Sequence, residues 1–178
     1  MPTGPADILA GSDAGAASPP AGMMGGMPGG AGSPQGAMPG QIMQMVASYK
    51  AVLAKNPNDL EANIGLGNLE FDSGQWSKAI DAYTRALKVD PKNADVRVDR
   101  AVAYHSTGAN DVAKVELTRV TKEHPDHKNA WLNLGVVASQ LGERSLALQA
   151  WQRYLELAPS GEHAAAIRQE IENLKRVP

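Results

Sequence analysis

Three consecutive segments of this 178-residue chain align with one another at a constant spacing, and they begin at Leu60, Ala94 and Lys128. Four columns hold small residues or proline, namely Gly67, Ala101 and Gly135; Gly74, Gly108 and Gly142; Ala79, Ala113 and Ala147; and Pro91, Pro125 and Pro159. A fifth column holds the large residues Tyr83, Leu117 and Trp151. Such a repeat predicts an array of similar units that bury their apolar faces against one another.

Each unit has the pattern of a helix–turn–helix. In the first unit, apolar residues recur at helical spacings in 60–73 and again in 76–89, without a sustained strand alternation. Gly74 separates the two helices, because glycine adopts a left-handed turn at little cost, and the proline column ends the second helix. Asp59 and Asn93 are residue types that cap the N-terminus of a helix. The small columns let the two helices approach closely.

These columns resemble the tetratricopeptide repeat family, in particular its bacterial-type domains with three repeats. The first and third copies match best, in Leu66-Gly67-Asn68 with Trp76-x-x-Ala79-Ile80 and in Trp131-x-x-Leu134-Gly135 with Ala147. The resemblance implies an all-α fold, a right-handed helical-repeat solenoid with repeats at 60–93, 94–127 and 128–161. It also implies a binding surface rather than a reaction centre.

The flanks extend this scheme to eight helices. Residues 41–57 align with the second helix of a repeat, and we interpret them as an N-terminal capping helix. Ser160 is predicted to cap a last helix over 162–176, with an apolar stripe inward and the polar outer face that a terminal cap requires. The repeat domain is therefore expected to span 41–178.

Residues 1–40 differ from the rest in composition. They hold 11 of the 18 glycines, 7 of the 12 prolines and only two charged residues. Such a segment buries too little apolar surface to offset the roughly 1–2 kcal/mol of backbone entropy that each ordered residue loses. We expect a disordered tail or linker. The run Met23-Met24-Gly25-Gly26-Met27 leaves open the alternative of a methionine motif that binds the groove or a partner.

The composition argues against several classes of function. The net charge of −2 and the lack of a basic stripe argue against nucleic acid as a partner. The chain contains no cysteine, no signal-peptide pattern at its N-terminus and no run of the ~18 apolar residues that a transmembrane helix needs. It is therefore expected to be cytoplasmic, without direct membrane insertion. The alternative is a periplasmic domain of a membrane-anchored protein, if the chain is a fragment.

No catalytic, cofactor or metal motif is complete, so the chain is not predicted to be an enzyme. Gly65-Leu66-Gly67-Asn68-Leu69-Glu70 begins like a dinucleotide fingerprint, but it lacks the third glycine and lies within a predicted helix. His124-Pro125-Asp126-His127 offers three polar ligands, but no Glu-x-x-His motif or cysteine pair supports them.

In the family, the first helix of each unit lines a concave groove, and the resemblance identifies the corresponding columns here. Three rows run along the groove: Ile64, Val98 and Leu132; Asn68, Val102 and Val136; and Phe71, His105 and Ser139. Polar and acidic residues flank them: Glu61, Asp72, Asp95, Asp99, Asn129, Asn133 and Gln140. We expect an accessible apolar floor with an acidic edge, suited to a protein or peptide segment that carries apolar and basic residues. The alternative is that some of these residues pack between neighbouring helices.

A variant of the family clamps the C-terminal carboxylate of chaperone tails with Lys, Asn and Arg at these columns. Only Asn68 matches that variant, because Ile64, Asn129 and Asn133 stand where basic residues are needed. Chaperone-tail binding is therefore not expected.

Two charged residues interrupt apolar columns. Arg100 occupies the column of Leu66 and Leu134, and Glu70 occupies the column of Tyr104. Because a buried unpaired charge is strongly destabilising, we predict an ion pair between Glu70 and Arg100 across the repeat boundary. The alternative is that both side chains reach solvent.

The predicted function is that of a non-catalytic adaptor that binds an extended or helical partner segment in the groove. The alternative is a structural scaffold that self-associates as a homo-oligomer. The pattern is also similar to bacterial repeat proteins that assist assembly of membrane or envelope complexes, including the interaction subunits of cytochrome c maturation.

Overall fold

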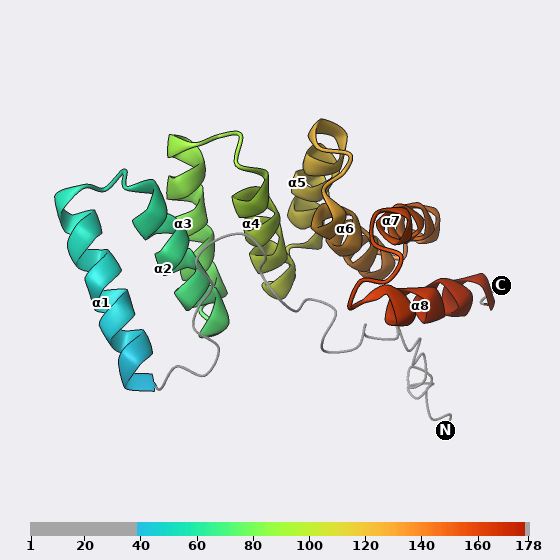
Figure 1. The fold of residues 1–178 in the computed structure, drawn as a ribbon, viewed down its shortest axis with the longest axis horizontal. Helices are drawn as coiled ribbons and strands as arrows, with labels where there is room; N and C mark the ends of the chain where they lie inside the picture. Colours follow the sequence, from blue (N-terminus) through green and yellow to red (C-terminus); the bar gives the residue numbers. More distant parts are fainter. Residues whose placement is uncertain (1–38, 177–178) are drawn as a thin grey trace, which may run out of the picture.

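The structure, a computed structural model, describes residues 39–176 and is all-α over that range. Its eight helices follow one another as an array (Figure 1): α1 (Pro39–Lys55), α2 (Leu60–Asp72), α3 (Trp76–Val89), α4 (Ala94–Ser106), α5 (Asn110–Glu123), α6 (Lys128–Gln140), α7 (Arg144–Leu157) and α8 (Ala164–Arg176). The pairs α2–α3, α4–α5 and α6–α7 are the three predicted repeats, and each pair packs on the next. The predicted helical-repeat fold is confirmed.

The tail or linker predicted for residues 1–40 lies outside the described residues, except that Pro39 and Gly40 belong to α1. None of the helices in the described range has the length and hydropathy needed to cross a membrane.

The two helices of each repeat meet at a glycine in the left-handed region. Gly74, Gly108 and Gly142 have φ angles of 70°, 83° and 72°. A side chain would strain this conformation, which explains why glycine recurs in the column. The predicted turns are confirmed.

The predicted helix caps are confirmed as well. Asp59 Oδ1 accepts a hydrogen bond of 2.9 Å from the backbone N–H three residues on, and Asn93 Oδ1 accepts the equivalent bond at 3.0 Å. His127, one full repeat after Asn93, is the third member of this column, and its Nδ1 accepts a bond of 3.2 Å in the same place. The first helix of every repeat therefore begins at a side-chain cap.

The small columns bring the paired helices into close contact. Ala79, Ala113 and Ala147 are completely buried. A Cβ atom added at Gly135 would lie 2.2 Å from the ring of Trp151 on α7, so the indole occupies the space that a side chain would need. The column of small residues thus accommodates the column of large ones.

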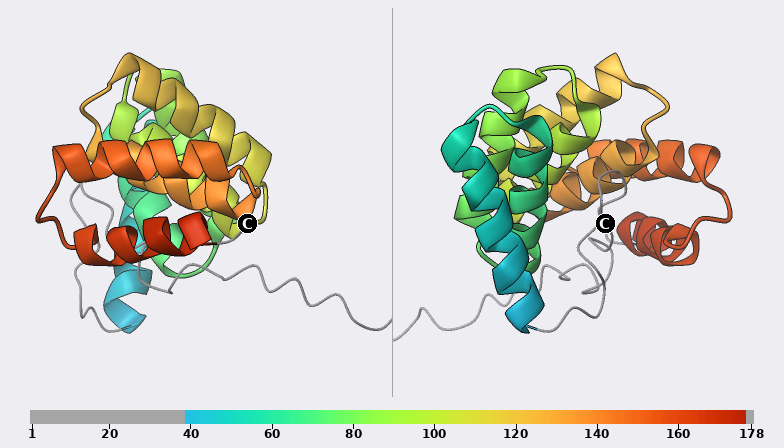
Figure 2. Two further views of the ribbon diagram at one scale, coloured as in Figure 1. Left: turned by 90° about the vertical axis from the view of Figure 1, so that its right-hand side faces the viewer. Right: turned by 60° about the vertical axis from the view of Figure 1, so that its left-hand side comes forward.

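α8 covers the C-terminal end of the array and lies beside α7 (Figure 2). Ile167 and Ile171 bury one face of α8 in a cluster with residues of α6 and α7, while much of the opposite face is polar and exposed. The prediction that Ser160 caps this helix is wrong. α8 begins at Ala164, because hydrogen-bonded turns occupy the chain between Ala158 and the helix.

Candidate protein-interaction site

The first helices of the repeats, α2, α4 and α6, share one face of the array, which we call the inner face. α4 packs on α6, and His127 Nε2 at the start of α6 lies 3.1 Å from Asp95 Oδ1 on α4. Asp72 on α2 is close enough to Asp99 on α4 to alter its pKa. Residues of all three repeats therefore meet on this face.

The apolar rows of the predicted groove lie deeper than expected. Val98 and Leu132 are each 3% exposed, and Val102 and Val136 are buried as well. The expectation that these residues form an accessible floor is wrong, because each packs between neighbouring helices. For Leu132 and Val136 the covering residues include the buried face of α8.

Accessible apolar surface remains over the first repeat. Ile64 and Phe71 on α2 are only partly buried, and both pack at the edge of the core. Any apolar contact on the inner face is therefore concentrated on α2.

Asp99 lies near the middle of the inner face and is only 8% exposed. Within the described range, no hydrogen bond or ion pair joins its carboxylate to another residue. Burial, followed by the negative charges of Asp95 and Asp72, raises the pKa of Asp99 to about 7. A carboxylate in this position is destabilised by lost hydration and by like charges, and a cation beside it would remove both effects.

One amide, Asn68, adjoins this acidic region. Asn68 is buried, and its Oδ1 accepts a hydrogen bond of 2.9 Å from the Tyr83 hydroxyl. Burial, together with the charges of Asp99, Asp72 and Glu70, raises the pKa of Tyr83, which therefore stays a neutral donor. Asn68 is thus oriented by the protein itself rather than free to turn toward a ligand.

Asn133 has an unmet acceptor. Its Nδ2 donates to the Asn129 carbonyl at 2.9 Å, while Oδ1 is buried without a partner among the described residues. A buried carbonyl oxygen without a donor is uncommon in folded proteins. This position of α6 therefore holds a carbonyl oxygen whose hydrogen-bonding capacity is unused among the described residues.

The remaining predicted site residues form the margin of the face. Glu61, Asp72 and Gln140 are exposed, whereas Asp95, His105, Asn129 and Ser139 are half-buried. His105 Nδ1 lies 2.6 Å from Asn110 Oδ1, which ties this side chain to the start of α5.

The role of His127 was missed at the sequence level, where it was considered only as a metal ligand. Its Nδ1 accepts the capping bond of α6, so the ring proton resides on Nε2 and is donated to Asp95. The alignment of His127 with the capping residue Asn93 could have indicated this role from the sequence. Across residues 39–176, no three histidines or carboxylates are grouped so that they could hold a metal ion.

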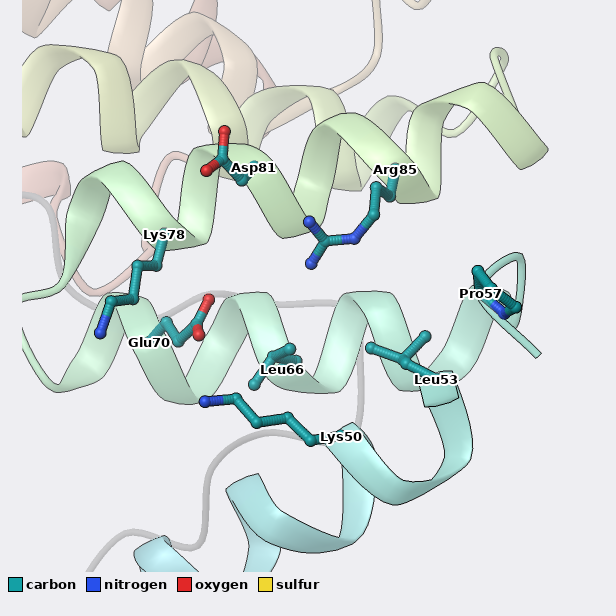
Figure 3. A pocket seen from close by; sticks show the side chains of 8 residues that line it. All are labelled: Lys50, Leu53, Pro57, Leu66, Glu70, Lys78, Asp81 and Arg85. Atoms are coloured by element: carbon teal, nitrogen blue, oxygen red, sulfur yellow. The ribbon is translucent and has the colours of Figure 1, made fainter. Parts of the chain in front are cut away.

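The predicted ion pair between Glu70 and Arg100 is wrong. Arg100 instead bonds Glu116 on α5, with Nη2 and Oε1 2.5 Å apart, and donates to Thr84 Oγ1 on α3 at 3.0 Å. Glu70 lies in a different environment, a pocket between α1, α2 and α3 (Figure 3). Side chains in the column of Arg100 reach the flanking second helices rather than the preceding first helix.

Paired helices with left-handed glycine turns, and an inner face built by the first helix of each pair, define a tetratricopeptide-repeat (TPR) protein, a class of protein–protein interaction module. The family model described as the cytochrome c-type biogenesis protein H TPR domain matches residues 37–165. The chain belongs to this family.

Among curated proteins, the chain is similar to the cytochrome c-type biogenesis protein CcmH of Escherichia coli (strain K12), with 30% identity over 133 residues, which cover 71% of this chain and 37% of that protein. It is also similar to the heat-shock protein cognate co-chaperone sgt12 of Aspergillus fumigatus, with 30% identity over 110 residues, which cover 62% of this chain and 32% of that protein. The chain thus spans about a third of the length of these relatives.

The fold matches that of the first TPR of Spaghetti (RPAP3), solved with the HSP90 peptide SRMEEVD. The TM-score is 0.61 and the identity 24%, and the match covers 66% of this chain and 90% of that chain.

Proposed function

We propose that this chain is a non-catalytic adaptor whose inner face binds a protein segment through a basic side chain placed against Asp99. The observation that supports this proposal is that Asp99 is only 8% exposed on this face, while residues 39–176 provide no hydrogen-bond or ion-pair partner for its carboxylate. Proteins seldom leave a buried carboxylate unpaired, because the desolvation is costly. A lysine or arginine from the bound segment would supply the missing interaction.

The flanking charges favour the same class of ligand. Asp72 and Asp95 both lie close enough to raise the pKa of Asp99, so the face concentrates negative potential around one position. Such a field speeds the encounter with a basic segment at low salt and disfavours acidic segments. The peptide SRMEEVD in the RPAP3 complex carries three acidic residues. We propose that ligands of that type are rejected here.

The half-buried apolar residues suggest how the segment is aligned. Ile64 and Phe71 offer apolar contact on α2, and Asp99 lies on α4. The proposed ligand therefore has an apolar anchor over the first repeat and a basic residue over the second.

The family suggests the biological process and the location in which the chain acts. Because the chain belongs to the CcmH-type TPR family, the proposed partner is a protein handled during cytochrome c biogenesis. The proposed location is then the periplasmic side of the membrane, as part of an anchored protein.

A self-associating scaffold is the second candidate. It is favoured by Met43 on α1 and Val115 on α5, which are 74% and 67% exposed. Analytical ultracentrifugation separates the two candidates, because the adaptor is expected to sediment as a monomer and the scaffold as an oligomer whose size rises with concentration.

Selection of phage-displayed random peptides tests the adaptor proposal. The wild-type domain is expected to enrich peptides with Lys or Arg near an apolar residue, and Asp99→Asn is expected to lose the basic preference. Asp126→Asn is the matched control, since Asp126 is exposed in the turn before α6. A bound cation lowers the pKa of Asp99, so binding of a selected peptide should tighten as the pH rises through about 7. Identical peptide sets from wild type and Asp99→Asn would refute the proposal.

A further inference from the structure

A pocket of about 360 Å³ opens between α1 and α3, with α2 as its floor. Figure 3 shows Lys50 reaching it from α1 and Lys78 and Arg85 from α3, on either side of the α2 segment that carries Glu70 and Leu66. The pocket contains none of the inner-face residues described above.

The equivalent position in the second repeat explains why this pocket is open. There Arg100 extends from α4 and is satisfied by Thr84 on α3 and Glu116 on α5. At the same place one repeat earlier, the column of Arg100 holds the shorter Leu66 and the column of Thr84 holds Lys50. The internal ion pair is therefore replaced by unfilled space with a cation at its margin.

The floor of the pocket carries a buried acid. Glu70 is 5% exposed and stands in the column where the second repeat has Tyr104. Within the described residues, no salt bridge within 4.0 Å joins Glu70 to the cations around it. Lys78 Nζ bonds Gln75 at 2.6 Å and Arg85 Nε bonds Asn63 at 2.8 Å.

The two ends of the pocket differ in chemistry. Leu53, Pro57 and Leu66 provide an aliphatic wall, while three cations and the two acids Glu70 and Asp81 line the rest. The positive charges outnumber the negative ones, so an added anion is attracted. An aliphatic group beside that anion would contact the leucines.

We propose that this pocket is a second binding site, which takes a carboxylate carried next to an aliphatic side chain. The carboxylate would lie between Lys50 and the Arg85 guanidinium, and the aliphatic group would pack on Leu53 and Leu66. Two sources share this chemistry, the C-terminal residue of a protein chain and a free branched aliphatic acid.

The protonation of Glu70 is expected to affect anion binding in this pocket. Burial raises the pKa of Glu70, and Asp81 adds to that effect, while Lys50, Lys78 and Arg85 oppose it. A second carboxylate brought beside Glu70 would raise its pKa further, so binding of the anion favours the protonated form of Glu70. Affinity for the anion is therefore expected to increase as the pH falls.

The test titrates the domain with N-acetyl-leucine and follows the backbone amide resonances by NMR. The expected result is saturable shifts around Leu53, Leu66 and Glu70, with N-acetyl-leucinamide, which lacks the carboxylate, causing none. Lys50→Gln is expected to weaken binding about fivefold, as for loss of a charge-assisted contact. Lys55→Gln is the matched control on α1, because Lys55 does not line the pocket.

Glu70→Gln provides a second measurement, with circular dichroism to verify that the variant is folded. It is expected to bind N-acetyl-leucine at least about threefold more tightly at pH 7 and to lose most of the pH dependence. Titration with 4-methylpentanoate then separates the sources: weaker binding than N-acetyl-leucine assigns a chain end, and equal or tighter binding assigns a free acid. The proposal would be overturned if N-acetyl-leucine caused no shifts, if Lys50→Gln left the shifts unchanged, or if N-acetyl-leucinamide caused equal shifts.

Discussion

Arg100 on α4 and Glu116 on α5 form a two-point ion pair in which the side chains are only 13% and 14% exposed. The pair fills a column that is leucine in the other two repeats, and it joins the second helix pair to α3 through Thr84. Charge thus replaces apolar packing at one position of an otherwise apolar array.

Arg100→Leu is expected to lower the free energy of unfolding by about 3 kcal/mol, because Glu116 is left desolvated without a partner. The double variant Arg100→Leu with Glu116→Leu should recover most of this loss. Urea unfolding measures both. Arg119→Ala removes the exposed pair with Glu123 and should cost less than about 1 kcal/mol. Equal losses in the single and double variants would contradict this account.

Gly135→Ala is expected to destabilise the fold by about 1–3 kcal/mol, since the new methyl group would meet the Trp151 ring at 2.2 Å. Gly40→Ala on α1 is the control, because nothing lies within 4 Å of its added Cβ. The control should be neutral or slightly stabilising, as alanine favours helix over glycine. Thermal melts compare the two, and similar melting temperatures would argue against close packing at Gly135.

Asp99 should make stability depend on pH. Its pKa rises from 3.8 in the unfolded chain to about 7 in the fold, so between these values the folded state holds a proton that the unfolded state lacks. The free energy of unfolding should therefore fall as the pH rises from about 4 to about 7, by up to about 4 kcal/mol, and then level off.

Asp99→Asn should remove this slope and be the more stable protein above about pH 7. Urea unfolding near pH 5 and near pH 8 measures the difference. The variant Asp126→Asn should keep the wild-type slope. A slope that survives in Asp99→Asn would assign the titration to another group.

The features that could be predicted from sequence are those set by local backbone geometry. Gly74 and its equivalents, and the caps at Asp59 and Asn93, act within a few residues of themselves, so alignment of the repeats identifies them. The partner of Arg100 could not be predicted in the same way. The alignment shows where on a helix a side chain begins, but an arginine side chain is long enough to reach either neighbouring helix. Which helix Arg100 contacts depends on Glu116, an acid 16 residues later.

The inner face was predictable only in part. The resemblance assigned the groove to α2, α4 and α6, yet the depth of each residue depends on what covers it. Leu132 belongs to the same buried cluster as Ile167 of α8, a helix that the alignment of three repeats does not contain. Asp99 was predicted as one acid among several, and only its burial distinguishes it.

Leu132→Ala should therefore act as a core substitution and cost about 2–5 kcal/mol, whereas an accessible groove residue would cost little. Val115→Ala is the control on an exposed apolar side chain and should change stability by less than about 0.5 kcal/mol. Urea unfolding distinguishes the two. A small loss for Leu132→Ala would restore the prediction of an accessible floor.

Removal of residues 1–38 should leave helix content and melting temperature nearly unchanged, since the composition of this segment predicts no core contribution. Circular dichroism of the shortened and full chains makes the comparison. A large loss of stability would instead support the alternative that the methionine run binds the repeats.

The stacking of each helix mainly on its sequence neighbours has a consequence for how the protein is made. Nearly every packing partner of a helix precedes or follows it directly along the chain. Few packing contacts involve a segment that is distant in the sequence. During synthesis from α1 onward, each new helix can therefore pack on the helix made just before it. The last repeat is the exception in timing, because the buried cluster that holds Leu132 and Val136 is complete only once Ile167 and Ile171 of α8 have been added.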